Sequence, residues 1–216
     1  MRTRTPETIR GARCVRAPQG FMTNPRKVLV IIGHPRRDSF CGALADAYAR
    51  GAREAGHEVR VVALGDLAFD PIRRTGYGDT PPLDPDLQRA QEDIAWCDHM
   101  AWAYPNWWGT MPALMKGFID RAILPGFAFR YREGKTFWDR LLSGRSARLL
   151  VTMDTPPLWY RWVIGRPGHN QMRRSVLGFC GVRPVRVSQF GVVKKASPAR
   201  RDTWLRETHH LGTRAR

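Results

Sequence analysis

The chain has 216 residues, enough for one domain with a substantial core, and 43% of them are hydrophobic, an ordinary share for a globular protein. Its formal net charge is +17, but only five of the 36 basic residues are Lys, so the charge reflects a bias toward Arg along the whole chain, and nucleic acid is not expected as its primary partner. The longest aliphatic run, residues 28–32, is far shorter than the roughly 20 residues that span a bilayer, so no membrane span is predicted.

The first 22 residues show no hydrophobic periodicity. Residues 1–26 hold six Arg and one Glu, and they contain no apolar stretch like the core of a secretory signal. We therefore predict that residues 1–22 form a disordered, basic N-terminal extension. Because Thr23-Asn24-Pro25-Arg26 leads directly into the first strand, we also expect Met22 to be the true start.

From residue 27 onward the pattern alternates between strand and helix. Strands are predicted at 28–32, 58–64, 99–103, 146–153 and 184–190, and helices from Ser39 as N-cap to Gly56 and at 85–97, 112–124 and 170–181. Residues 69–82 form a loop rich in Gly and Pro, and 126–144 form an insertion. This alternation predicts a parallel, doubly wound α/β domain over 23–193. Residues 194–216, with seven basic and two acidic residues, are interpreted as a basic C-terminal tail.

The four cysteines are widely spaced. No pair makes a Cys-x-x-Cys, so neither a zinc ribbon nor a thioredoxin-type site is indicated, and no metal site is expected. Four Cys in a chain of this size do not suggest a disulfide scaffold, which favours a reducing cytoplasm.

The turn after the first strand is polar. It contains neither G-x-G-x-x-G nor a Walker P-loop, but it carries His34, Arg36, Arg37, Asp38 and Ser39. Free N–H groups at a helix start form an anion site, to which the Ser39 hydroxyl and a His34 donor would add hydrogen bonds. The alternative is that Ser39 simply caps the helix and both arginines are solvated.

A second loop, Asn106-Trp107-Trp108-Gly109, follows the third strand. Loops at the carboxyl ends of strands line the ligand crevice of an open α/β sheet. Two adjacent Trp cannot both point inward from a regular strand, so at least one is expected at the crevice, unless both are packed under the next helix. Hydrogen-bond donors for a phosphate, beside a flat apolar surface for a ring, suit a flavin nucleotide.

Four stretches carry a family resemblance, in order, over about residues 26–192: GHPRRDSF, YPNWWGTMPALMKGFIDRAI, GFAFRY and FCGV. They resemble the NAD(P)H:quinone oxidoreductase family of flavoproteins, the DT-diaphorase-like branch of the flavodoxin fold. P-x-W-W-G-x-x-P-A-x-x-K-G is the most specific element. The resemblance implies a flavodoxin-like, five-stranded parallel sheet of order 2-1-3-4-5 with helices on both faces. It also implies a homodimer with its pocket at the subunit interface.

The resemblance also implies the site residues. Phe129 and Tyr131 match aromatic positions near the quinone pocket, and Tyr160 is the candidate for substrate binding or protonation. Cys41 stands where the family usually has Asn, and residues 153–157 replace a Thr/Ser-Gly-Gly run. The implied flavin-binding residues are His34, Ser39, Phe40, Cys41, Pro105, Asn106, Trp107, Trp108, Gly109, Met153, Asp154 and Thr155.

The activity implied by the resemblance is hydride transfer from NADH or NADPH to bound FAD or FMN, followed by transfer of two electrons to a quinone-like acceptor. Two alternatives remain open: an azo, nitroaromatic or free-flavin acceptor, and a non-enzymatic flavin- or nucleotide-binding regulator of a partner protein. Two further hypotheses are that Cys41 has a lowered pKa at its helix start and that His169 is a general acid. Both compete with plain packing roles.

Overall fold

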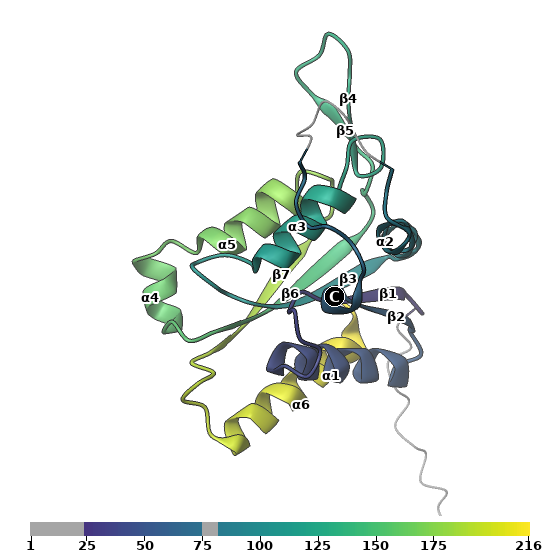
Figure 1. The fold of residues 1–216 in the computed structure, drawn as a ribbon. Coiled ribbons are helices and arrows are strands. Elements are labelled where there is room, and N and C mark those ends of the chain that lie inside the picture. The colour runs from purple at the N-terminus through teal and green to yellow at the C-terminus, as the bar shows by residue number, and fades with distance from the viewer. Residues whose placement is uncertain (1–23, 75–81) are drawn as a thin grey trace, which may run out of the picture.

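A five-stranded parallel sheet forms the centre of the computed structural model, which describes residues 24–74 and 82–216. The predicted disordered extension at 1–22 and part of the predicted 69–82 loop lie outside the described residues. The sheet order is β2-β1-β3-β6-β7, which is 2-1-3-4-5 for the strands of this sheet and confirms the expected topology (Figure 1). Its strands are β1 (Lys27–Ile32), β2 (Glu58–Ala63), β3 (His99–Pro105), β6 (Ser146–Met153) and β7 (Val185–Gly191).

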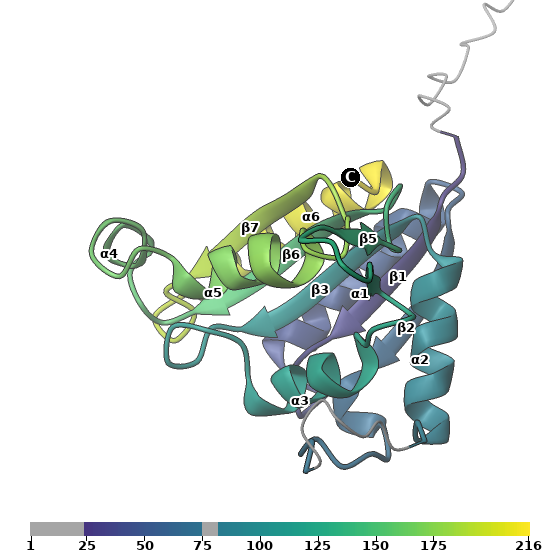
Figure 2. The same ribbon diagram turned by 90° about the horizontal axis from the view of Figure 1, so that it is seen from above.

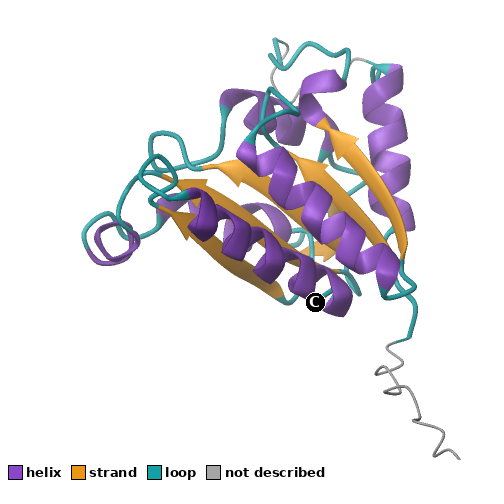
Figure 3. Ribbon diagram, turned by 90° about the horizontal axis from the view of Figure 1, so that it is seen from below, coloured by secondary structure: helices purple, strands orange, loops and turns teal. Residues whose placement is uncertain are grey.

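Helices cover both faces of the sheet. Helices α1 (Phe40–Glu54) and α6 (Pro198–Arg214) lie on one face (Figure 3). Helices α2 (Pro85–Trp96) and α3 (Ala113–Ala122) lie on the other, together with α5 (Pro167–Asn170), which continues as the π-helix η2 (Gln171–Leu177) (Figure 2). The remaining elements are the 3-10 turn η1 (Leu64–Asp66), the hairpin β4 (Phe129–Tyr131) and β5 (Trp138–Arg140), and helix α4 (Pro157–Trp162).

The alternation of β1 explains why this sheet has two cores. Val30 and Ile32 point to the layer of α1 and α6, whereas Leu29 and Ile31 point to the layer of α2 and α3. All four side chains are buried, as expected for a parallel strand covered on both faces.

The expectation that residues 194–216 form a basic tail is wrong, because residues 198–214 form helix α6. Ser197 caps the helix by accepting a hydrogen bond from the Arg200 amide at 3.2 Å, and Trp204 and Thr208 are buried against the sheet layer. The arginines of α6 lie on its exposed side. Their number gives the segment a strongly polar composition, which obscures the spacing of the buried residues 204 and 208. The cap Ser197-Pro198 and the 204, 208 spacing are the signals that would have predicted the helix.

Two glycines allow α6 to approach α1 closely. A Cβ at Gly212 would lie 2.1 Å from the Tyr48 carbonyl oxygen, and one at Gly51 would lie 2.0 Å from the His209 carbonyl oxygen. Any side chain at either position would force the helices apart, so these residues fix the distance between them.

Helix boundaries near residue 170 also differ from expectation. The helix predicted at 170–181 begins earlier, at Pro167, and α4 at 157–162 was not predicted. Proline opens both helices at the first turn, where its missing N–H costs nothing. Within the described ranges, no helix has the length and hydropathy needed to cross a membrane.

Candidate functional site at the carboxyl edge of the sheet

Three loops meet where the parallel strands end: 33–39 after β1, 106–112 after β3 and 153–157 after β6. We call them together the carboxyl-edge site. The Gly33 amide donates to the Ala103 carbonyl at 2.8 Å, and the Asn106 amide donates to the Thr152 carbonyl at 2.7 Å, so hydrogen bonds to neighbouring strands fix where these two loops begin. The His34 and Trp107 rings meet edge to face at 5.5 Å between centroids.

Ser39 begins α1 as predicted. Its Oγ accepts a hydrogen bond from the Gly42 amide at 3.2 Å, which confirms the N-cap. A hydroxyl that accepts in this way still has its own hydrogen to donate. Capping and anion binding are therefore compatible at Ser39. Arg36 lies exposed and pairs with Asp38 at 3.5 Å.

His34 lies in the first loop with its Nδ1 engaged by the backbone of Arg36. Nδ1 lies 2.9 Å from the Arg36 amide nitrogen and 3.0 Å from the Arg36 carbonyl oxygen, so it accepts from the first in one tautomer and donates to the second in the other. In the tautomer in which Nδ1 accepts, Nε2 carries the hydrogen and can donate to a ligand. Burial lowers the pKa of His34, so the ring is neutral near pH 7.

Phe40 and Cys41 point away from the loops. Phe40 packs on Trp204 of α6, with 6.1 Å between ring centroids. Cys41 is buried, with its Sγ 3.2 Å from the Thr152 hydroxyl, and burial raises the pKa of the thiol to about 11. The hypothesis of a low-pKa, reactive Cys41 is therefore wrong, since the thiol stays protonated at neutral pH.

Trp108 and Gly109 occupy the tip of a tight turn. Trp107 and Thr110 exchange two backbone hydrogen bonds of 2.8 and 3.0 Å, and the φ angles of Trp108 and Gly109 are 51° and 82°, the pattern of a type I′ turn. Glycine suits this conformation, whereas a Trp in the left-handed region costs about 1–2 kcal/mol. The two backbone hydrogen bonds of the turn use the amides of Trp107 and Thr110, which leaves those of Trp108 and Gly109 at its tip.

Both tryptophans of this loop reach the surface. Trp108 is fully exposed and Trp107 is 45% exposed. The alternative in which both are packed under the next helix is therefore wrong. A strained, fully exposed Trp is a pattern found at functional sites more than in packing roles.

Tyr160 holds this turn through a hydrogen bond to its backbone. Its hydroxyl donates to the Gly109 carbonyl oxygen at 3.0 Å and accepts from the Gly168 amide at 3.1 Å, and the side chain is fully buried. This placement makes Tyr160 a positioning residue and argues against the expected role in binding or protonating substrate. His169 packs edge-on against the Tyr160 ring at 5.0 Å, and burial lowers its pKa to about 4, so it is neutral at pH 7.

Gly168 is a site residue that the sequence analysis missed. Its amide also lies 2.9 Å from the Gly109 carbonyl oxygen, and a Cβ at this position would lie 2.7 Å from the same oxygen and 2.8 Å from the Thr110 Cα. Thr110 bonds onward to Gln171 at 2.5 Å. The start of α5 therefore sets the position of the 107–110 turn.

The third loop offers few donors. Met153 is buried at the end of β6, and the Asp154 carboxylate accepts from the Lys194 amide at 2.7 Å. Pro156 and Pro157 have no N–H to offer. Thr155 is therefore the residue of this loop whose amide and hydroxyl can both donate to a ligand.

An apolar surface adjoins the site on α4, which projects beyond the sheet in both views (Figures 1 and 2). Large hydrophobic side chains of this helix and the residues after it are exposed to solvent. We call this set the α4 surface: Leu158, Trp159, Trp162, Val163 and Ile164.

Phe129 and Tyr131 do not join the carboxyl-edge site within one chain. They lie on the β4–β5 hairpin, far from α4 in Figure 1, because α3 carries the chain back across the sheet before the hairpin begins. Phe129 packs against Phe179 at 5.0 Å between centroids, whereas Tyr131 is 65% exposed. The expected quinone-pocket position of both is thus not formed by this chain alone.

A family model described as flavodoxin-like fold matches residues 26–210. The chain is 29% identical over 152 residues to a ribosyldihydronicotinamide dehydrogenase-like protein of Penicillium crustosum, covering 59% of this chain and 57% of that one, so it spans little more than half of that relative's length. It is 25% identical over 168 residues to an uncharacterized NAD(P)H oxidoreductase of Haemophilus influenzae, covering 76% and 82%. The structure of an NAD(P)H:quinone oxidoreductase from Methanothermobacter marburgensis is similar with a TM-score of 0.70 and 25% identity, covering 88% and 98%.

Proposed function

Because the chain belongs to the flavodoxin-like fold family, we propose that it is an NAD(P)H-dependent flavin oxidoreductase that passes two electrons to a quinone-like acceptor. The observation that carries this proposal is the exposed, strained Trp108 at the tip of the carboxyl-edge turn. The similarity to NAD(P)H oxidoreductases and to a quinone oxidoreductase supports it.

The donors of the site fit a flavin nucleotide. The Ser39 hydroxyl, the His34 ring in its Nε2–H tautomer and the start of α1 suit a phosphate. The amides of Trp108 and Gly109 suit the polar edge of an isoalloxazine, and the indole of Trp108 offers a flat face to the ring system.

When bound, a flavin supplies hydride acceptance and two-electron transfer. The chain's own residues would position the bound flavin and polarise its ring system. Fixed amide dipoles at the 107–110 turn would stabilise negative charge on a bound flavin, by the logic of an oxyanion site. Tyr160 and Gly168 hold the turn in place, so the donors need little reorganisation.

The substitution Trp108→Gly tests this proposal. Glycine accepts the positive φ of Trp108, and no cavity forms because the side chain is exposed, so the melting temperature should not fall. Flavin occupancy or turnover should fall at least tenfold, about 1.4 kcal/mol. Flavin retention and NAD(P)H oxidation are measured on the same preparation.

The matched variant Trp108→Phe keeps an aromatic face at the same strained position and should recover most of the lost flavin binding. If Trp108→Gly binds and reduces flavin as well as the parent protein, the turn is not the flavin site.

The acceptor is the least constrained part of the proposal. Two prolines and an engaged Asp154 distinguish the 153–157 loop, so an azo, nitroaromatic or free-flavin acceptor stays in competition with a quinone. Steady-state rates with each acceptor class separate these activities. A protein that binds flavin and NAD(P)H but turns over with none of them is instead a regulator.

We further propose that the chain acts as a homodimer in the cytoplasm. The α4 surface exposes five large hydrophobic side chains within residues 158–164, and such a concentration of exposed apolar side chains is typical of a protein–protein interface. A second copy would also supply the hairpin aromatics that one chain does not bring to its own site. The buried thiols of Cys41, Cys97 and Cys180 are free, which suits a reducing compartment.

The substitution Trp162→Glu tests the dimer. A charge in the centre of the α4 surface should convert a dimer into a monomer of 24.7 kDa, because an unpaired carboxylate is costly to bury. Light scattering after size exclusion measures the mass. Trp162 is 73% exposed in the single chain, so monomer stability should not change. A parent protein that is monomeric at micromolar concentration contradicts the proposal.

A further inference from the structure

A cavity of about 570 Å³ lies at the amino edge of the sheet, opposite the carboxyl-edge site. Segments preceding or beginning β1, β3, β6 and β7 contribute to its wall, and we call it the amino-edge cavity. Its charged and hydroxyl-bearing lining residues are Arg26, Asp98, Ser146, Arg183, Arg186 and Arg216.

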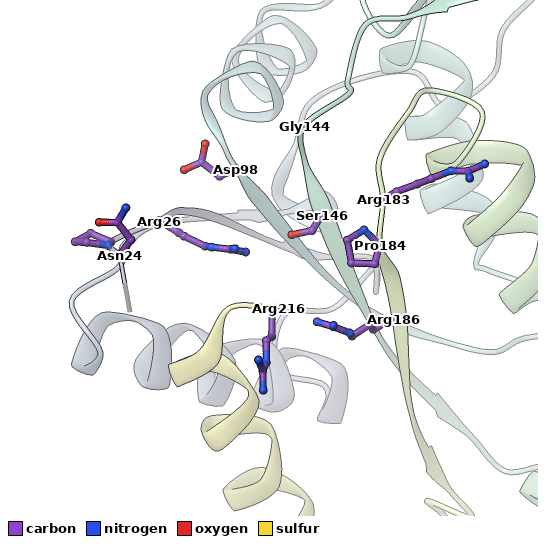
Figure 4. Close-up of a pocket in the computed structure, with 10 residues that line it drawn as sticks. Asn24, Arg26, Asp98, Gly144, Ser146, Arg183, Pro184, Arg186 and Arg216 are labelled. Carbon is purple, nitrogen blue, oxygen red and sulfur yellow. The ribbon is translucent and has the colours of Figure 1, made fainter. Parts of the chain in front are cut away.

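Positive charge converges on this cavity. Figure 4 shows Arg26 and Arg186 extending toward the hollow from opposite sides, whereas the side chains of Arg216 and Arg183 extend away from it. The Arg26 guanidinium also donates to the Ala215 carbonyl oxygen at 2.9 Å. Within the described ranges, none of these four guanidinium groups pairs with a carboxylate. Asp98 accepts a hydrogen bond from the Lys27 amide at 3.0 Å, and its side chain is directed away from Arg186 and Arg216 in Figure 4.

A buried histidine, His99, contacts the lining residue Ser146 and is affected by the positive charge of the arginines. His99 is fully buried, and its pKa is lowered to about 3, first by burial and then by Arg26 and Arg148 among its neighbours, with Arg186 adding to the effect. Arg26 and Arg186 are exposed and Arg148 is buried, so solvent screens part of the repulsion among these like charges. An anion in the cavity would relieve the repulsion that remains.

A chain of hydrogen bonds orients a donor into the same cavity. The Tyr48 hydroxyl lies 2.8 Å from His99 Nε2, and His99 Nδ1 lies 2.8 Å from the Ser146 Oγ. When the Tyr48 hydroxyl donates to His99 Nε2, neutral His99 donates through Nδ1 to Ser146, and the Ser146 hydroxyl hydrogen is left for a ligand.

We infer that the amino-edge cavity binds a small phosphate compound with more than one charge, of the pyrophosphate or nucleoside diphosphate class. Guanidinium groups match phosphate oxygens in geometry, and two of them, Arg26 and Arg186, extend toward a hollow that the Ser146 hydroxyl also lines. The cavity volume is within the range of small-molecule sites. A second cavity of about 520 Å³ shares Arg183 and Pro184 and is also lined by Arg173 and Arg174, which gives room beside the first for a longer ligand.

A compact hollow favours a small ligand over nucleic acid, whose backbone is bound by charges spread along a groove or stripe. Unlike the flavin proposal, this inference concerns the opposite edge of the sheet. Loss of either site leaves the other measurable.

Calorimetric titration of the full chain with inorganic pyrophosphate, at about 150 mM salt to screen nonspecific attraction, tests the inference. The parent protein should show saturable binding. Arg186→Gln should weaken it by about fivefold or more, since a charge-assisted hydrogen bond is lost. The control Arg50→Gln removes the same charge from an exposed position on α1 and should leave the affinity within about twofold.

Ser146→Ala provides a second variant, with melting temperature checked because its hydroxyl also contacts His99. It should weaken pyrophosphate binding while retaining the fold. Absence of saturable binding, or equal losses in Arg186→Gln and Arg50→Gln, overturns the inference. So does an oligonucleotide that binds more tightly than pyrophosphate and displaces it, since the surface would then serve nucleic acid.

Discussion

Gly168→Ala should lower the free energy of unfolding by about 3 kcal/mol and weaken flavin binding more than Trp108→Gly does. The new Cβ would lie 2.7 Å from the Gly109 carbonyl oxygen and 2.8 Å from the Thr110 Cα, both of which are backbone atoms that cannot rotate away. The turn must shift, and with it the amides of Trp108 and Gly109. Chemical denaturation and flavin titration measure the two effects.

Ser175→Ala is the control for this variant, because Ser175 is exposed on η2, the continuation of the same helix. It should change neither quantity. A Gly168→Ala protein with parental stability and parental flavin affinity would show that the start of α5 does not set the turn.

Stability should fall steeply as the pH drops below about 6.5, because of His99. Its pKa is about 6.5 in the unfolded chain but is lowered to about 3 in the fold by burial and by the surrounding arginines. Above pH 6.5 both states are neutral and the stability is complete. Between these values the unfolded chain binds the proton more readily, which costs about 2 kcal/mol near pH 5. His169, with its pKa lowered to about 4, acts in the same direction.

The variant His99→Gln isolates this contribution. Glutamine retains hydrogen-bonding groups for Tyr48 and Ser146 but does not titrate, so its stability should depend less on pH than that of the parent. Urea unfolding from pH 7 to pH 4.5 gives both curves. Curves that run parallel over this range contradict the assignment.

The sequence predicts the sheet well because its signal is local. The alternation of β1 and its aliphatic run specify a strand buried on both faces, and Ser39 specifies the start of α1. Helix α6 was missed because its buried residues are few and its charge is high. Its packing on α1 also depends on Gly51 and Gly212, which lie in two segments far apart in sequence. Close approach of this kind leaves no periodicity to detect.

In the candidate site, too, the sequence predicts the features that depend on local residues and misses those that depend on contacts between distant segments. Two adjacent Trp predict an exposed aromatic loop, and the structure places both at the surface. The sequence does not indicate that Tyr160 points under the turn, since that depends on where α4 and α5 lie in space. Phe129 is assigned by resemblance to a pocket that its own chain does not reach.

The most direct test of the flavin site is an absorbance spectrum of the purified protein after reconstitution with FMN and, separately, with FAD. We expect the protein to retain at least one of them with the bands of oxidised flavin, and we expect NADH or NADPH to bleach those bands. The better-retained nucleotide then identifies the cofactor. A colourless protein that retains neither would show that the carboxyl-edge site does not bind flavin, and the turn at Trp108 and Gly109 would need another ligand.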